Sequence, residues 1–281
     1  METQQEKDLR IWNAVKKFFQ DHKEQLPLNE HNTNPPSDIT GINAVYWRML
    51  VSAQNRQRMS NFIKFNEPAE KWRRIFFNDF DPKKVFDEYA VNDEKLWNAI
   101  HYYRDENDNG KKFLMKTFVR AAIDSAIFLQ TFDYDLDKLR NFLNGFPPSL
   151  KYVVPYIIST PIYGYGYALA CDFLKECEEL EFDIVKPDIH IKNFLAAIDN
   201  NPKENQSQKI KYTDPEIVKR MHQFVVNVGP IGFEDCFKWR TPGKTGDDYK
   251  LDKIIWFLFS SKKGPFKDEF LKTIQHASWR N

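Results

Sequence analysis

Residues 161–192, with the sequence PIYGYGYALACDFLKECEELEFDIVKPDIHIK, are the most informative stretch of this chain. A Gly-Tyr-Gly turn at residues 164–166 is followed by a helix-like run and then by a single carboxylate, Asp188, in an Asp-Ile-His string. The two glycines permit a positive φ and the close approach of another backbone. A helix that starts directly after them aims its unbonded N–H groups outward, which suits a phosphate. Because one helix and a return loop can bring Asp188 back near the turn, the pattern suggests chemistry on a nucleic acid.

The rest of the chain carries helical periodicity. Leu9, Ile11, Trp12, Val15 and Phe18 recur at helical spacing, which predicts an amphipathic helix over residues 7–22. Further helices are expected from about residue 40 to a break near 53–55, over 68–77, 82–89, 93–103, 111–129, 136–143, 167–180 and 189–198, from Asp214 to about Gly229, and over 251–260 and 266–278. The sequence shows no repeats and no convincing run of strands, so the predicted fold class is all-α.

Composition describes an ordered globular protein. Of the 281 residues, 42% are hydrophobic and 15% aromatic, which favours an ordered globular protein over a disordered one. The formal net charge is only +1. Any face that binds nucleic acid must therefore be a local patch, balanced by acidic surface elsewhere.

The three cysteines, Cys171, Cys177 and Cys236, contain no CxxC pair, which argues against a zinc ribbon or an iron–sulfur cluster. An odd count without framework spacing fits a reducing compartment. The charged N-terminus lacks the apolar core of a signal peptide, and no apolar run reaches membrane-spanning length. We expect an intracellular protein, in the cytoplasm or nucleoid or in a nucleus, with no membrane partner.

Three segments resemble the helix-hairpin-helix DNA glycosylases, the superfamily that includes endonuclease III, the adenine glycosylases and the alkyl-base glycosylases. Gly164-Tyr165-Gly166 matches the family's hairpin, and Asp188-Ile189-His190 matches its catalytic Asp string. Residues 49–56 (MLVSAQNR) are similar to its Leu-Leu-Ser-Ala-Gln segment. The order and spacing also fit, over about residues 40–200. The resemblance implies a central helical domain over 40–180, a second domain from 1–39 and 181–281, and a base pocket between them.

The resemblance makes Asp188 the catalytic carboxylate. Breaking the bond between base and sugar develops positive charge on the sugar, which a carboxylate stabilises while it orients or deprotonates water. The structural alternative is that Asp188 caps the helix beginning at Ile189, and the two roles can coexist.

The family's bifunctional members carry a lysine just after the hairpin glycines, where this chain has Ala168. The resemblance therefore implies a monofunctional glycosylase that needs no cofactor and leaves an abasic site in double-stranded DNA. Lys186 and Lys192 flank Asp188 and are the alternative source of a lyase amine, or else contact phosphate or solvent. Two rivals remain: a helix-hairpin-helix module that binds DNA without catalysis, and a helical interaction protein in which the motif matches arose by chance.

The other expected DNA contacts also follow from the resemblance. The hairpin residues Gly164, Tyr165, Gly166, Tyr167 and Ala168 would hold a backbone phosphate, with a bound monovalent cation as in the family and no other metal. Gln54 would border the gap left by the extruded base, assisted by Asn55 and Arg56. The alternatives are a tight interhelical turn for the first group and a helix-breaking polar turn for the second.

Two further residues are expected near the base pocket. His190 follows Asp188 by two positions and is expected to be structural rather than a general base. Trp239 lies in Phe237-Lys238-Trp239-Arg240 before a Gly/Pro loop and is the least core-like tryptophan, so it is the candidate for stacking on a damaged base. We expect a monomer, and no motif names the base that is removed.

Overall fold

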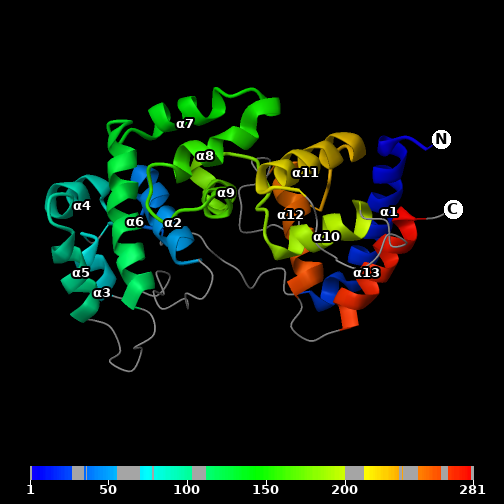
Figure 1. Ribbon diagram of the computed structural model, residues 1–281, viewed down its shortest axis with the longest axis horizontal. Coiled ribbons are helices and arrows are strands. Elements are labelled where there is room, and N and C mark those ends of the chain that lie inside the picture. Colours follow the sequence, from blue (N-terminus) through cyan, green and yellow to red (C-terminus); the bar gives the residue numbers. More distant parts are fainter. Residues whose placement is uncertain are drawn as a thin grey trace. The chain divides into compact units, whose positions relative to one another are not determined.

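The computed structural model describes residues 2–26, 35, 37–55, 70–77, 79–102, 112–199, 212–233, 236, 246–260 and 265–279. Within these ranges every regular element is a helix, which confirms the all-α prediction (Figure 1). The chain divides into two compact units. We call residues 33–182 the middle unit, and residues 1–32 with 183–281 the terminal unit.

The middle unit is a helical layer built around α2 and α6. Its helices are α2 (Gly41–Gln54), α3 (Glu70–Ile75), α4 (Pro82–Tyr89), α5 (Asp93–Tyr102), α6 (Lys112–Gln130), α7 (Leu136–Asn144), α8 (Val154–Ser159) and α9 (Tyr167–Glu176), with 3₁₀ turns at Pro148–Val153 and Glu178–Leu180. Helix α6 packs against α2 and α4, and α9 packs against α2 and α8. Trp47, Phe118 and Phe173 are fully buried between these helices.

The terminal unit combines the two ends of the chain. It contains α1 (Gln4–His22), a 3₁₀ turn at Lys23–Gln25, α10 (Ile189–Asp199), α11 (Asp214–Val228), α12 (Asp247–Ser260) and α13 (Pro265–Ser278). Helix α1 packs against α13 and α11, and α10 packs against α12 and α13. The N-terminal helix is therefore part of this core, as its buried residues Ile11, Val15 and Phe19 show.

Several helices begin where the local sequence supplies a cap. Thr3 and Glu6 form a capping box at the start of α1, and Thr213 forms one with Glu216 at α11. The Oδ1 atom of Asp135 accepts the backbone N–H groups of residues 137 and 138 at α7, at 2.8 and 3.0 Å. The starts of α7 and α11 agree with the sequence prediction, whereas α1 begins at Gln4, three residues before the predicted position 7, because the capping box of Thr3 and Glu6 extends it.

A buried charge cluster joins three helices of the terminal unit. Arg220 of α11 donates to both oxygens of Asp8 in α1, at 3.0 and 2.7 Å, and to both oxygens of Asp199 at the end of α10, at 3.0 and 3.2 Å. Asp8 has no exposed surface, and it also accepts from Asn227 at 2.7 Å. The two carboxylates raise the pKa of the Arg220 guanidinium against the opposing effect of burial. This cluster fixes α1 to the C-terminal helices.

Helix α12 starts four residues earlier than the predicted position 251, at Asp247. The cause is a cap from a distant part of the chain, because Asp183 accepts the backbone N–H groups of Asp248 and Tyr249 at 3.3 and 2.9 Å. A Cβ atom at Gly246 would overlap the Asp183 carboxylate. The Asp183 carboxylate can therefore reach the start of α12 only because residue 246 has no side chain.

Two other elements differ from the sequence prediction. Helix α8 was not expected, because Pro147, Pro148 and Pro155 indicate a break in the chain; Pro155 instead lies in the first turn of α8, where its missing N–H costs nothing. Helix α9 ends at Glu176 rather than near 180, because Cys177 has extended backbone angles (φ −85°, ψ 100°) before a 3₁₀ turn.

Candidate functional site

The segment that leads to Asp188 is anchored to α12. Ile184 and Val185 are fully buried in the terminal unit. The backbone N–H of Lys186 donates to Oδ2 of Asp252 at 2.8 Å, and Asp252 is itself 1% exposed. Together with the cap from Asp183, this bond ties residues 183–186 to the first turns of α12. The position of Asp188 is therefore set by a buried scaffold.

Asp188 caps helix α10. Its Oδ1 atom accepts the backbone N–H groups of His190 at 2.8 Å and Ile191 at 3.1 Å, and its carbonyl accepts the N–H of Lys192 at 3.0 Å. The residue is partly exposed, and Ile189 beside it is 62% exposed. No described residue donates a hydrogen bond to Oδ2. One carboxylate oxygen is thus fixed by the helix, while the other is available to a ligand or to water.

His190 has a structural environment. Its ring lies against Trp256 and Phe259 of α12, with centroid distances of 6.1 and 6.4 Å. Burial lowers the pKa of His190 below its ordinary value, and the negative charge of Asp188 opposes this effect. Its Nδ1 atom is buried and has no hydrogen-bond partner among the described residues. A neutral ring that packs against aromatic side chains fits the structural role that we expected.

Lys192 points its ammonium group at a carboxylate of its own unit. Its Nζ atom lies 2.7 Å from Oδ1 of Asp214, at the start of α11. This pairing competes with the phosphate contact that we expected for Lys192. It also disfavours Lys192 as the amine of a lyase reaction, because the Nζ atom would have to leave Asp214 to reach a sugar.

The hairpin between α8 and α9 uses its two glycines differently. Gly164 has a φ of +69°, which favours glycine, whereas Gly166 is extended (φ −76°, ψ 166°) and is the N-cap residue of α9. Only Gly164 adopts the positive φ that both glycines permit, because the N-cap position of Gly166 requires extended backbone. A Cβ at Gly166 would meet no atom within 4 Å, so this side of the turn is open.

The hairpin amides are only partly available to a ligand. The N–H of Tyr165 donates to the Ile162 carbonyl at 3.0 Å. The N–H groups of Gly166 and Ala168 bond no described residue, so they can meet an anion at the start of α9. The Ile162 and Gly166 carbonyls accept amides within the turn, and nothing in the hairpin points specifically to a bound cation. The cation stays a prediction.

Tyr165 belongs to the core of the middle unit. Its side chain is 3% exposed, and its hydroxyl donates to the carbonyl of Met49 in α2 at 3.4 Å. Burial raises the pKa of this hydroxyl well above its ordinary value. Because its amide is bonded to Ile162 and its side chain is buried, Tyr165 presents neither group to DNA. Its role is to pack the interhelical turn against α2.

The end of α2 and helix α9 are joined by one buried carboxylate, Asp172. Its Oδ2 atom accepts from Arg48 Nη2 at 2.9 Å, Ser52 Oγ at 2.8 Å and Asn55 Nδ2 at 3.1 Å. Arg48 and Asp172 are 2% and 5% exposed. The structure thus brings the segment around Ser52–Asn55 together with the helix that follows the hairpin. A charged residue among Ala170, Cys171 and Phe173 is the sequence signal that could have pointed to Asp172.

The residues that were expected to border the gap left by an extruded base are held within the protein or lie outside the described residues. Gln54 is 4% exposed, so its side chain is buried in the middle unit rather than presented to a DNA gap. The side-chain amide of Asn55 is bonded to Asp172. Arg56 and Trp239 lie outside the described residues.

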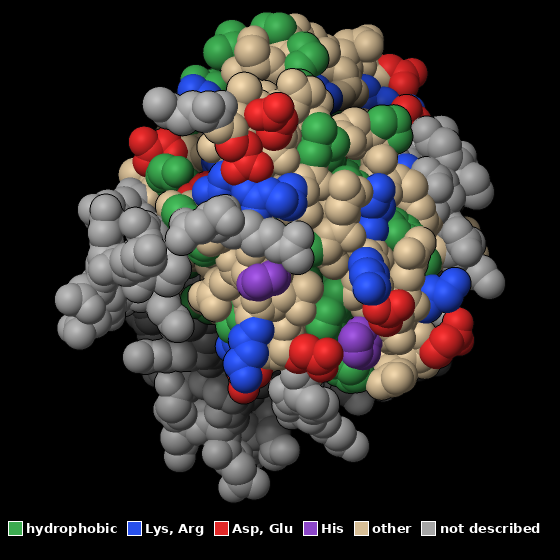
Figure 2. Space-filling view, turned by 90° about the vertical axis from the view of Figure 1, so that its right-hand side faces the viewer, with side chains coloured by type: hydrophobic (Ala, Val, Ile, Leu, Met, Phe, Trp, Pro, Cys, Tyr) green, Lys and Arg blue, Asp and Glu red, His purple; other side chains and the backbone are tan. Residues whose placement is uncertain are grey.

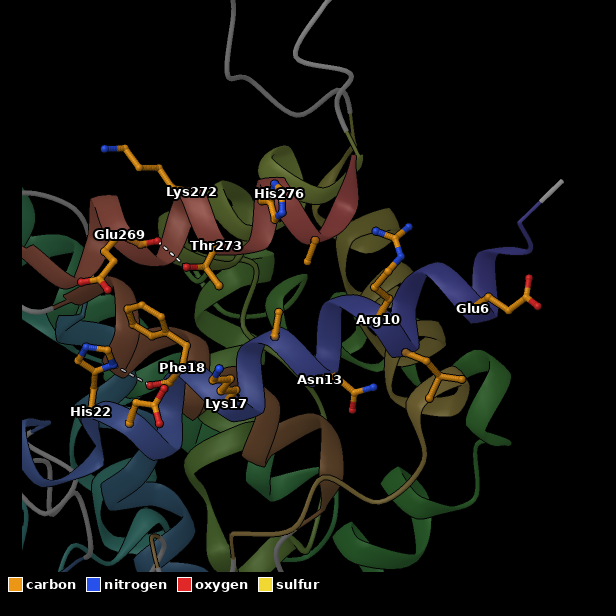
Figure 3. A pocket seen from close by; sticks show the side chains of 14 residues that line it. Glu6, Arg10, Asn13, Lys17, Phe18, His22, Glu269, Lys272, Thr273 and His276 are labelled. Carbon is orange, nitrogen blue, oxygen red and sulfur yellow. Dashed lines mark hydrogen bonds between the residues drawn. The ribbon is translucent and has the colours of Figure 1, made fainter. Parts of the chain in front are cut away.

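A groove of about 960 Å³ lies between α1 and α13 in the terminal unit. Its walls carry residues such as Arg10, Lys17, Phe18, Glu269 and His276 (Figure 3). Cationic and anionic side chains are mixed along the lining, as they are over the face of the molecule shown in Figure 2. None of the site residues expected from sequence lines this groove.

Comparison with family models, curated proteins and solved structures finds no match to this chain. Among the described helices, none has the length and apolar character needed to cross a membrane. The described residues also contain no group of three or more His, Cys, Asp or Glu side chains able to hold a metal ion.

Proposed function

We propose that this protein is a monofunctional DNA glycosylase of the helix-hairpin-helix type, which removes a damaged or modified base from double-stranded DNA. The observation that carries the proposal is the arrangement of Asp188. One oxygen of its carboxylate is fixed by two backbone N–H groups, and the other has no partner among the described residues. A fixed, partly exposed carboxylate suits a reaction that develops positive charge on a sugar.

In the proposed reaction the target nucleotide is extruded from the duplex, since its glycosidic bond cannot be reached within the stack. Asp188 then stabilises the positive charge that forms on the sugar and orients the attacking water. The N–H groups of Gly166 and Ala168 hold a backbone phosphate at the start of α9. Water is the proposed nucleophile, because Ala168 stands where the bifunctional members of the family carry a lysine and supplies no amine.

The non-catalytic binding module is the second candidate, and one observation favours it. The cap that Asp188 supplies to α10 already gives this residue a structural role. A module of this kind would bind duplex DNA in a salt-dependent manner without releasing any base.

Base release and strand scission on a panel of duplexes test the proposal. Each duplex carries one lesion, such as an oxidised purine, an alkylated purine or a deaminated base. Base release that gives strand breaks only after alkali supports the monofunctional glycosylase and identifies its substrate. Breaks without alkali would instead indicate a lyase amine. Duplex binding without base release on any member would favour the binding module.

A further inference from the structure

Two tyrosines of the α8–α9 segment have side chains exposed to solvent. Tyr156 of α8 is 48% exposed, and Tyr163 in the turn is 49% exposed. An exposed aromatic ring gains free energy when a partner covers it, so these two rings are candidate contacts for a ligand. We define the tyrosine surface as Tyr156, Tyr163 and Tyr167 with Arg120.

Tyr163 is held in place from α6. Its backbone N–H donates to Oδ2 of Asp124 at 2.8 Å, and the Arg120 guanidinium lies 5.1 Å from the centre of its ring. Arg120 and Asp124 are one turn apart on α6, so a single helix fixes both the backbone and the ring of Tyr163. The result is an exposed ring of defined orientation beside a cation.

Tyr156 is fixed by its neighbours in a similar way. Its ring lies against that of Tyr167, with 4.8 Å between the centroids and a tilt of 58°. The hydroxyl of Tyr167 donates to the carbonyl of Tyr152 at 2.8 Å, which orients the supporting ring. Both exposed tyrosines are therefore ordered before any ligand binds, which lowers the entropic cost of binding.

Fixed aromatic rings next to an arginine are the features that bind unpaired bases. Every base has a π face that stacks on an aromatic ring, and a guanidinium attracts the phosphates that link the bases. Paired bases inside a duplex cannot stack on these rings. We propose that the tyrosine surface binds single-stranded DNA, by stacking of unpaired bases on Tyr156 and Tyr163, with Arg120 contacting the phosphate backbone. This proposal rests on the proposed function for its choice of DNA as the partner.

The proposal is tested with a labelled oligothymidine and a duplex of the same length, by fluorescence anisotropy on the full chain. Tyr163→Ala and Tyr156→Ala are each expected to raise the Kd for oligothymidine about tenfold. Tyr163→Phe and Tyr156→Phe keep the stacking ring and are expected to bind within about twofold of the wild type. Tyr212→Ala removes a tyrosine that is 38% exposed in the terminal unit and serves as the matched control.

Circular dichroism of each variant checks that the helices are retained. Wild-type protein that does not bind oligothymidine would overturn the proposal, as would alanine variants that bind it like Tyr212→Ala. Base release from lesion-bearing duplexes is measured in parallel. If the protein releases a base but does not bind oligothymidine, only the proposal for the tyrosine surface is overturned. If it binds oligothymidine through the tyrosines but releases no base, only the glycosylase proposal is overturned.

Discussion

Gly246→Ala is expected to destabilise the terminal unit, because the new methyl group would occupy the place of the Asp183 carboxylate. That carboxylate accepts the N–H groups of Asp248 and Tyr249 at the start of α12. The clashing atoms belong to the end of the Asp183 side chain, which avoids the methyl group only by leaving the cap, and loss of a helix cap costs about 0.5–2 kcal/mol. We expect the free energy of unfolding to fall by about 1–2 kcal/mol.

Urea unfolding followed by circular dichroism measures this change, and Gly166→Ala is the control. Gly166 has a negative φ, and a Cβ there would meet no atom within 4 Å. Its replacement is expected to leave stability within about 0.5 kcal/mol of the wild type or to raise it slightly.

A double-mutant cycle isolates the contact itself. Asp183→Ala alone is expected to cost about 1–2 kcal/mol through loss of the cap. In that background Gly246→Ala is expected to cost less than about 0.5 kcal/mol, because the methyl group no longer meets a carboxylate. If the two single costs simply add, the cap does not depend on the space at Gly246, and the reasoning is refuted.

Three further predictions concern buried charges. Asp8→Asn leaves the Arg220 guanidinium with one of its two carboxylate partners. The free energy of unfolding, measured by urea denaturation, should fall by about 3 kcal/mol. A fall of less than about 1 kcal/mol would contradict a stabilising role for the charge cluster. Burial lowers the pKa of His190, so its NMR titration should have a midpoint below 6.5, and Asp188→Asn should lower it further by removing the opposing charge. As the pH falls, the unfolded chain binds a proton at His190 before the folded protein does. The contribution of neutral His190 to stability is therefore present above pH 6.5 and is lost as the pH falls through the folded-state pKa. His190→Gln should reduce this loss of stability at low pH. Asp172→Ala leaves the Arg48 guanidinium buried without its carboxylate and should destabilise the middle unit by about 3 kcal/mol, whereas an unchanged urea midpoint would show that the pair contributes nothing.

Local sequence patterns were sufficient to predict the presence of most of the helices. The cap at Asp135 and the Pro215 at the start of α11 act on neighbours within a few residues, so sequence alone locates these two starts. The start of α1 at Gln4 was missed by three residues, because the prediction of 7–22 followed the apolar periodicity and not the capping box at Thr3. The glycines of the hairpin permit a positive φ, and Gly164 adopts one. The cap at Asp188 was one of two interpretations that the sequence allowed, and it is present.

Contacts between distant segments were not predictable in this way. Asp183 caps a helix that begins more than 60 residues later, and Asp8 lies 212 positions from Arg220. The burial of Tyr165 and Gln54 also depends on which face of each element packs inward, and short polar or aromatic runs do not specify that face. The sequence therefore located Asp188 and the hairpin, but it did not reveal Asp172 and Asp252, which fix their surroundings.

The most direct test of the central claim compares two Asp→Asn variants in single-turnover base release from the duplex that the wild type processes. Asp188 and Asp135 both cap a helix through Oδ1, and Asn preserves such a cap, so both variants should fold. The proposed mechanism predicts that Asp188→Asn loses at least about 100-fold in rate, with duplex binding retained, while Asp135→Asn keeps the wild-type rate. Base release by Asp188→Asn at the wild-type rate would contradict the assignment of Asp188 as the catalytic carboxylate.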